Sequence, residues 1–218
     1  MMRVVECVPN FSEGRDKAVL DAIAEAVRGV EGVELLDVDP GRATHRTVFT
    51  FVGAPEAVAE AAFRAVAVSA ERIDMRRHRG EHPRIGAADV VPFVPLVGTT
   101  MQDCVELARA TGRRIGDELG IPVYLYESAA TRPERRNLAD IRAGEYEKLE
   151  AKLKDPAWAP DGQSLSYLAT SQGRQGVYRT KSGGRDLITD DPAVAYSGLW
   201  LDKASIITVT NQAATPHA

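Results

Sequence analysis

Short β-branched apolar runs alternate along this chain with stretches whose apolar residues recur at helical spacing, and their order constrains the fold more than any other feature. In chain order we predict a strand, a helix, two strands, a helix and a strand, at about residues 4–8, 16–30, 33–39, 44–52, 55–75 and 88–97. This is the order of the split βαβ arrangement. We therefore predict an α/β (α+β) fold, a ferredoxin-like βαββαβ mixed sheet with helices on one face, extended by a further helix and strand.

Prolines and glycines set the expected boundaries of these elements. Pro40-Gly41 indicates a turn between the second and third strands. Pro92 and Pro95 remove backbone donors from the fourth strand, which should therefore lie at a sheet edge or be irregular. Gly120 ends the next helix. The later elements that we predict are a helix at about 105–119, a strand at 122–126 and a short helix at 145–153.

The charge distribution suits a small anionic substrate better than a polyanion. The net charge is −4, so the total charge gives no indication of a nucleic-acid or membrane-surface protein. Positive charge is nevertheless concentrated in one stretch, at Arg72, Arg76, Arg77, Arg79 and Arg84. The alternative is a solvated helix end with its usual cations.

The two cysteines and the apolar stretches indicate a cytoplasmic protein. Cys7 and Cys104 lie in apolar surroundings and form no disulfide framework, which is typical of reduced, buried thiols. The amino terminus lacks the apolar core of a secretory signal, and no stretch approaches the roughly 20 apolar residues of a membrane span.

The stretch HRGEHPRIG, residues 78–86, fits H-x-x-E-H, the inverted zinc-protease motif. That site needs His78 and His82 one turn apart on a helix. Gly80 disfavours a helix, and Pro83 pushes the residue before it into an extended conformation. We therefore expect the preceding helix to end near His78, with Gly80 as its terminating residue, and we expect no metal site.

A histidine held in such a loop suits acid–base chemistry. Its imidazole can both accept and donate a proton near neutral pH, so His82 is the candidate catalyst, with a solvated surface histidine as the alternative. Asp37 and Asp39 should share one strand face with Leu35, where a carboxylate could orient the imidazole or simply belong to turn chemistry. The loop that begins at Asn10 could hold an anion, although it lacks the spacing of a nucleotide-binding loop.

Six blocks in order resemble the amino-terminal subdomain of glutamate formimidoyltransferase, which occurs alone or fused to a cyclodeaminase: VECVPNFSEGRD, LLDVDPG, RTVFTFVG, IDMRRHRGEHPRIGAADVVPFVP, PVYLYE and IRAGEYE. The resemblance runs from about residue 4 to residue 161. It implies a folate-binding enzyme of histidine degradation and one-carbon metabolism. Such a transferase moves a formimidoyl group from N-formimidoyl-L-glutamate to N5 of tetrahydrofolate, its co-substrate, and releases glutamate.

The resemblance also implies roles for individual residues. The family's active-site histidine lies in the GEHPR block and corresponds to His82, and Asp39 in the LLDVD block is its expected orienting partner. Substrate binding falls to Asn10, to Arg46 at the start of RTVFTFVG, and to two arginines that can pair with substrate carboxylates, Arg79 and Arg84.

The resemblance ends where the composition changes. We expect residues 1–161 to form the amino-terminal subdomain, and we interpret residues 162–218 as a divergent tail, the truncated or frameshifted remainder of a second subdomain. An exposed face where that subdomain should pack would favour a homo-oligomer. Two alternatives remain open: a non-catalytic subdomain that binds folate or a partner, and a relative that handles 5-formyltetrahydrofolate.

Overall fold

The structure is a computed structural model that describes residues 2–148 and, beyond them, the backbone of short strands between residues 157 and 207. The chain divides into two compact units. The first comprises residues 1–112 and 124–146, and the second comprises residues 113–123 and 147–218. The boundary that we predict near residue 161 lies outside the described residues.

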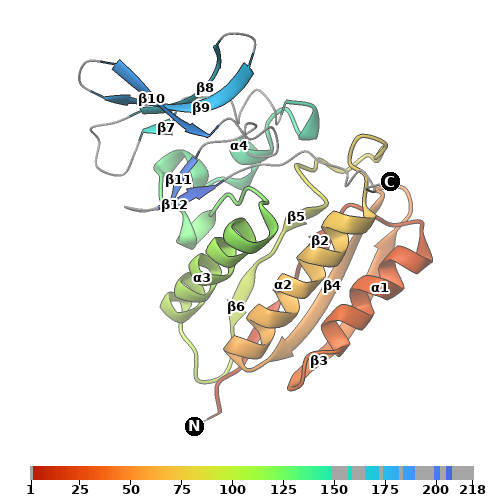
Figure 1. Ribbon diagram of the computed structural model, residues 1–218. Helices are drawn as coiled ribbons and strands as arrows, with labels where there is room; N and C mark the ends of the chain where they lie inside the picture. Colours follow the sequence, from red (N-terminus) through yellow and green to blue (C-terminus); the bar gives the residue numbers. More distant parts are fainter. Residues whose placement is uncertain are drawn as a thin grey trace. The chain divides into compact units, whose positions relative to one another are not determined.

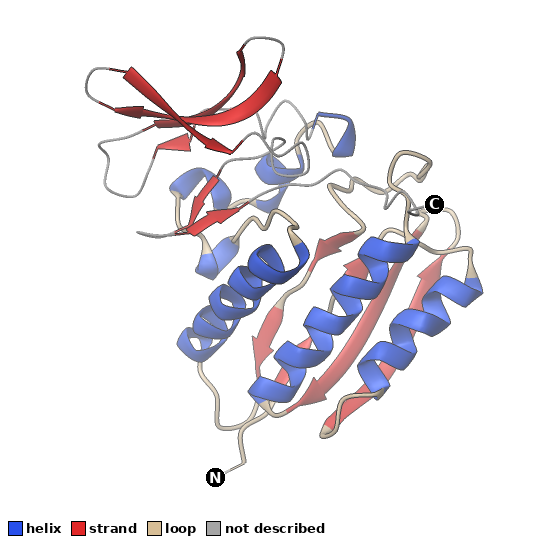
Figure 2. Cartoon of the chain, in the orientation of Figure 1, coloured by secondary structure: helices blue, strands red, loops and turns tan. Residues whose placement is uncertain are grey.

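The first unit contains a sheet covered by helices on one face (Figures 1 and 2). Its strands are β1 (Val5–Cys7), β2 (Asn10–Phe11), β3 (Val33–Gly41), β4 (Arg46–Gly53), β5 (Ala88–Val90) and β6 (Phe93–Pro95). Its helices are α1 (Lys17–Arg28), α2 (Pro55–Arg72), α4 (Leu138–Arg142) and the first part of α3 (Met101–Leu119). Single 3-10 turns occur at Glu127–Ala129, Pro133–Arg135 and Tyr146–Lys148.

Strand pairing confirms the ferredoxin-like arrangement. β4 lies between β3 and the pair β1 and β2, and β5 and β6 pair with the far side of β2 and β1. Counting β1 with β2 and β5 with β6 as one strand each, the order is fourth, first, third, second. All these pairings are antiparallel, so the prediction of a mixed sheet is wrong.

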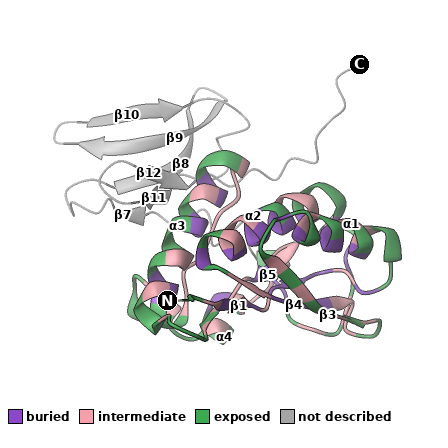
Figure 3. Cartoon of the chain, turned by 90° about the horizontal axis from the view of Figure 1, so that it is seen from below, coloured by how far each residue is buried: buried purple, intermediate pink, exposed green. Residues whose placement is uncertain are grey.

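Helix α1 forms where its apolar spacing predicts it, and a side-chain cap marks its start. The Asp16 carboxylate accepts from the amides of Ala18 and Val19, which satisfies donors that the first turn leaves free. Buried residues lie on one side of α1 and α2 and exposed residues on the other (Figure 3). Pro55 opens α2 as predicted.

The core lies between these helices and the sheet. Ile23 and Val27 of α1 and Val58 of α2 are fully buried there. Phe11 and Phe49 pack edge to face, with ring centroids 5.3 Å apart and an interplanar angle of 86°. Both rings therefore point to the helical side of the sheet, which leaves the alternate residues of β2 and β4 on the other face.

Several predicted boundaries require correction. The hairpin turn lies at residues 42–45, because β3 continues in register with β4 through Pro40 and Gly41. Helix α2 ends at Arg72 rather than near His78, because Ile73 adopts an extended backbone and buries its side chain. Residues 122–126 form no strand, and within 145–148 only a 3-10 turn occurs, the rest of that predicted helix lying outside the described residues.

The prediction from Pro92 and Pro95 that the fourth strand is irregular or lies at a sheet edge is confirmed. The fourth strand is interrupted at Pro92 into β5 and β6, and each half lies at an edge of the sheet. The first predicted strand, at residues 4–8, corresponds to β1 alone. The second strand, β2, follows Val8 and Pro9 and begins at Asn10, where we predict a loop.

The second unit contains strands paired only with one another. β7 (Ala157–Trp158), β8 (Leu165–Ser171), β9 (Arg174–Lys181) and β10 (Gly184–Thr189) form an antiparallel sheet in chain order. β11 (Leu199–Leu201) pairs with β12 (Ser205–Ile207). Among the described residues, no helix has the length and apolar character needed to cross a membrane.

Candidate active site

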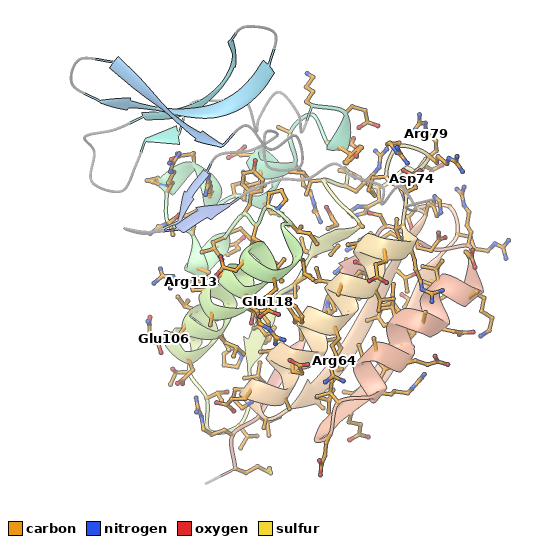
Figure 4. The ribbon with its side chains drawn as sticks, in the orientation of Figure 1. Arg64, Asp74, Arg79, Glu106, Arg113 and Glu118 are labelled. Carbon is orange, nitrogen blue, oxygen red and sulfur yellow. The ribbon has the colours of Figure 1, made fainter. Side chains whose placement is uncertain are left out.

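The segment that carries His82 is an irregular loop between α2 and β5, residues 73–87. Asp74 and Arg79 lie on it beyond the end of α2 (Figure 4). His78 and Arg84 are buried, at 3% and 7% exposure, whereas His82 between them is half-buried. The two histidines of H-x-x-E-H therefore do not lie one turn apart on a helix, and they differ in burial.

His78 is held as a neutral ring. Its Nε2 donates to the backbone oxygen of His45 at 2.8 Å, and its Nδ1 accepts from Nε of Arg84 at 3.0 Å. Burial lowers the pKa of His78 and outweighs the hydrogen bond to the His45 backbone oxygen, which raises it, while the charges of the His45 ring and Arg84 act in the same direction as burial. Both nitrogens are occupied and the proton sits on Nε2, so His78 offers neither a metal ligand nor a free base.

His45, in the turn between β3 and β4, stacks on His78. The ring centroids are 4.3 Å apart and the planes differ by 11°. Nδ1 of His45 lies 2.9 Å from the backbone oxygen of Arg79, and Nε2 lies 3.0 Å from Oε1 of Glu13. Both partners are acceptors, so the doubly protonated ring is the form that satisfies both contacts.

Glu13 anchors this arrangement as a carboxylate. Its Oε1 also accepts from the backbone amides of Gly14, Arg15 and Asp16. Burial acts to raise the pKa of Glu13, but these amides and the nearby His45 outweigh it, and the net shift is downward. The loop after β2 therefore binds the β3–β4 turn through an ionised side chain.

Within residues 2–148, His82 makes a hydrogen bond through only one of its ring nitrogens. Its Nδ1 lies 2.6 Å from the backbone oxygen of Pro83, so Nδ1 carries the proton of the neutral ring and donates it to that oxygen. Nε2 then has its lone pair available. Because Pro83 follows His82 directly, the contact orients the ring relative to its own loop, so the position of the ring depends on that loop.

Two ion pairs connect the His82 loop and β5 to the segment that follows α3. Arg84 pairs with Glu145, and Asp89 pairs with Arg142. The Asp89 side chain is fully buried, and its Oδ1 also accepts from the amide of Ile85 at 3.0 Å. The IRAGEYE segment thus holds both ends of the stretch from Arg84 to Asp89.

Three of the predicted site residues share the sheet face opposite the helices. Asp39 and Asn10 both lie directly across from Val48, and Arg46 is two residues from Val48 along β4. Asp37 shares this face with Asp39 as predicted. The prediction that Leu35 also does so is wrong, because a bulge between Leu35 and Asp37 changes the alternation.

Two atoms on this face are buried without a hydrogen-bond partner among the described residues. They are Oδ1 of Asn10 and Nε of Arg46. Burial lowers the pKa of Arg46, opposed by Asp89 and assisted by Arg142. A buried polar atom without a partner is uncommon, so these two atoms distinguish this face from the rest of the sheet.

The remaining predicted site residues differ in how far they are engaged. Arg79 is exposed, and its guanidinium donates to the backbone oxygen of His78 at 2.6 Å. The Arg84 guanidinium is bound to His78 and Glu145. Asp39 is exposed and, within residues 2–148, has no hydrogen-bond or ion-pair partner, so it is not in contact with His82.

Sequence reasoning missed five residues that organise this region. Asp89, Arg142 and Glu145 lie in quoted blocks, but nothing in the local sequence indicates which charge meets which. The only local signal for Glu13 is its position three residues before Asp16, the N-cap of α1, and His45 has no local signal at all.

Comparison with known proteins identifies relatives of this chain. A family model described as the formiminotransferase domain, N-terminal subdomain, matches residues 4–174. A formimidoyltransferase-cyclodeaminase of Rattus norvegicus is 55% identical over 168 residues, which are 77% of this chain and 31% of that protein. A glutamate formimidoyltransferase of Streptococcus pyogenes serotype M1 is 50% identical over 161 residues, 74% of this chain and 54% of that protein. A glutamate formimidoyltransferase of Thermoplasma acidophilum is 52% identical over 162 residues, which are 73% of this chain and 54% of that protein.

Proposed function

Because this chain belongs to the family of formiminotransferase N-terminal subdomains, we propose that it takes part in transferring a formimidoyl group from N-formimidoyl-L-glutamate to N5 of tetrahydrofolate. The chain spans 31% of the length of the bifunctional rat relative and 54% of the streptococcal one. The proposal includes the formimidoyl donor and the folate acceptor, and a role in histidine degradation and one-carbon metabolism. It also includes a cytoplasmic location and self-association of the chain.

His82 is the acid–base residue of the proposed reaction. The N5 amine of tetrahydrofolate attacks the formimidoyl carbon, and a tetrahedral intermediate forms. Nε2 of His82 takes the proton that the amine loses and returns it to the departing nitrogen of glutamate as the carbon–nitrogen bond breaks. No net proton is gained or lost by the ring, as a single imidazole near neutral pH allows.

The observation that carries this assignment is the contact between His82 and Pro83. It places the proton of the neutral ring on Nδ1 at 2.6 Å from the Pro83 oxygen, so Nε2 is the basic atom. His78, the other histidine of the motif, has both nitrogens engaged. Of the two, His82 is therefore the ring that can exchange a proton with a substrate.

Substrate binding falls to the polar groups near this loop and on the sheet face opposite the helices. Arg46 and Arg79 are the proposed partners of substrate carboxylates, since a guanidinium binds a carboxylate through paired donors. Asn10 offers a buried amide oxygen as an acceptor. Asp39 remains the proposed orienting carboxylate, which requires its exposed side chain to reach the His82 ring when substrates bind. Arg84 is predicted to contribute through the loop that it holds, because its guanidinium is already bound to His78 and Glu145.

Incubation of the chain with N-formimidoyl-L-glutamate and tetrahydrofolate tests the proposal, with released glutamate and 5-formimidoyltetrahydrofolate as the products measured. Parallel reactions contain 5-formyltetrahydrofolate in place of the donor and acceptor. We expect transfer in the first reaction only. Consumption of 5-formyltetrahydrofolate alone would contradict the proposal in favour of a formylfolate-handling enzyme. Binding of tetrahydrofolate without turnover in either reaction would contradict it in favour of a non-catalytic folate-binding subdomain.

A further inference from the structure

We propose that His45 and His78 act together as positioning residues that fix the loop carrying His82. The proposal deepens the function above and rests on it for the role of His82. The two rings, with Arg84 and Glu13, form what we call the histidine clamp, defined as Glu13, His45, His78 and Arg84.

The clamp closes the loop at both ends of the segment 78–84. His78 and Arg84 are the buried residues of that segment, and their side chains are joined by the bond from Nε of Arg84 to Nδ1 of His78 at 3.0 Å. The residues between them are exposed or half-buried, and His82 is one of these. The bond therefore converts an open loop into a short closed one that displays His82.

The β3–β4 turn packs against the same segment and hydrogen-bonds to it. The His45 ring stacks on His78 and its Nδ1 donates to the backbone oxygen of Arg79, while the backbone oxygen of His45 accepts from Nε2 of His78. Gly80 packs so closely on this turn that an added Cβ would lie 2.3 Å from the oxygen of Thr44. These contacts leave the backbone at residues 78–80 little freedom.

The protonation states within the clamp are complementary. The His45 ring meets an acceptor at each nitrogen, Glu13 on one side and the Arg79 oxygen on the other, whereas His78 meets one acceptor and one donor. The two stacked rings therefore have different hydrogen-bonding requirements. His45 also adopts a left-handed backbone with φ of 51°, which is uncommon for a residue other than glycine.

The same contacts exclude a direct role for either ring in proton transfer. All four ring nitrogens of His45 and His78 are engaged with groups of the chain. Exchange of a proton with a substrate would break the contacts that hold the loop. The clamp therefore acts through His82, whose Nε2 it keeps in place.

Variants of His78 separate the contacts of the clamp. In His78→Asn the side-chain oxygen can still accept from Arg84, and in His78→Gln the side-chain amide can still donate to the His45 oxygen. His78→Ala loses both contacts and the stack. Asp74→Asn is the matched control, because it alters an exposed ion pair with Arg76 in the same loop, outside the clamp.

Three measurements on the full chain report whether the histidine clamp holds the loop and positions His82. Trypsin cleavage after Arg79, an exposed residue, reports the population of the open loop. Nitrogen NMR of labelled histidine rings reports which nitrogen of His82 carries the proton. The kcat and KM for formimidoyl transfer report the consequence for the reaction.

We expect His78→Ala to be cleaved after Arg79 about tenfold faster than the unmodified chain, since a lost contact of a buried group typically corresponds to that factor. The Asn and Gln variants should lie in between, and Asp74→Asn should match the unmodified chain. In His78→Ala the His82 ring should pass from the Nδ1–H form to a mixture, and kcat should fall with little change in KM.

Two results would overturn the proposal. One is an unchanged cleavage rate and an unchanged His82 tautomer in His78→Ala, which would mean that the clamp does not hold the loop. The other is a changed tautomer with kcat retained in a chain that transfers the group. A chain without transfer activity would count against the proposed function alone, because cleavage and tautomer still decide whether the clamp positions His82.

Discussion

Asp89→Asn should destabilise the first compact unit by about 3 kcal/mol, because it leaves the half-buried Arg142 without its buried carboxylate partner. The Asp89 side chain is fully buried and Arg142, its partner, is only 16% exposed, so water can replace little of the lost interaction. Arg46 also feels the charge of Asp89. Removing one member of a buried ion pair typically costs about 3–5 kcal/mol, and we take the lower end because asparagine can still accept from the amide of Ile85.

Urea unfolding followed by far-ultraviolet circular dichroism measures this change. With a slope of about 2 kcal/mol per molar urea, the midpoint should fall by about 1.5 M. Asp21→Asn is the matched control, since Asp21 pairs with Lys17 on the surface of α1 and both side chains are more than half exposed. Exposed pairs of this kind contribute about 0.5 kcal/mol or less.

A double variant separates the charge effect from packing. Asp89→Asn combined with Arg142→Met should be more stable than Asp89→Asn alone, because the unpaired charge is removed along with its partner. Equal midpoints for Asp89→Asn and Asp21→Asn would refute the reasoning. So would a double variant that loses the sum of the two single effects, since the two residues would then act independently.

Two further predictions concern the His82 loop. Gly80→Ala should lower the free energy of unfolding by about 1–3 kcal/mol in the same urea assay, because its Cβ would lie 2.3 Å from the Thr44 oxygen. Gly86→Ala is the control and should change little, because its Cβ would lie 3.5 Å from the Ala88 oxygen. Equal effects of the two substitutions would contradict the close packing at Gly80. Burial holds the pKa of His78 below its ordinary value of 6.5 beside His45, Arg84 and Glu13, so the unfolded chain binds a proton there that the folded chain does not, and stability should fall as pH decreases below that value. His78→Gln should flatten the urea midpoint between about pH 7 and about pH 5, and an unchanged slope would contradict this.

The sequence predicts the elements whose signals are local. The apolar spacing from residue 16 locates α1, Pro55 locates the start of α2, and Pro92 locates the interruption of the last strand of the sheet. Gly80 and Pro83 likewise predict that the His82 stretch is not helical. In each case one or two residues restrict the backbone directly, without any contact from elsewhere in the chain.

Long-range contacts decide what the sequence does not predict. The hairpin turn moves past Pro40-Gly41 because pairing with β4 continues to Gly41, and a bulge after Leu35 changes the face on which later residues lie. The partners Arg84 and Glu145 are 61 residues apart, and His45 and Arg79 are 34 apart. No local pattern relates such residues, so the histidine clamp emerges only from the fold.

The assignment of His82 as the acid–base residue is tested most directly by comparing formimidoyl transfer in the unmodified chain and in His82→Gln. Glutamine keeps a polar side chain but cannot take up the proton of the attacking amine. We expect the rate to fall by about 10²–10⁴, the usual contribution of a general acid–base residue, with an unchanged circular-dichroism spectrum. Transfer by His82→Gln at the rate of the unmodified chain would contradict the assignment.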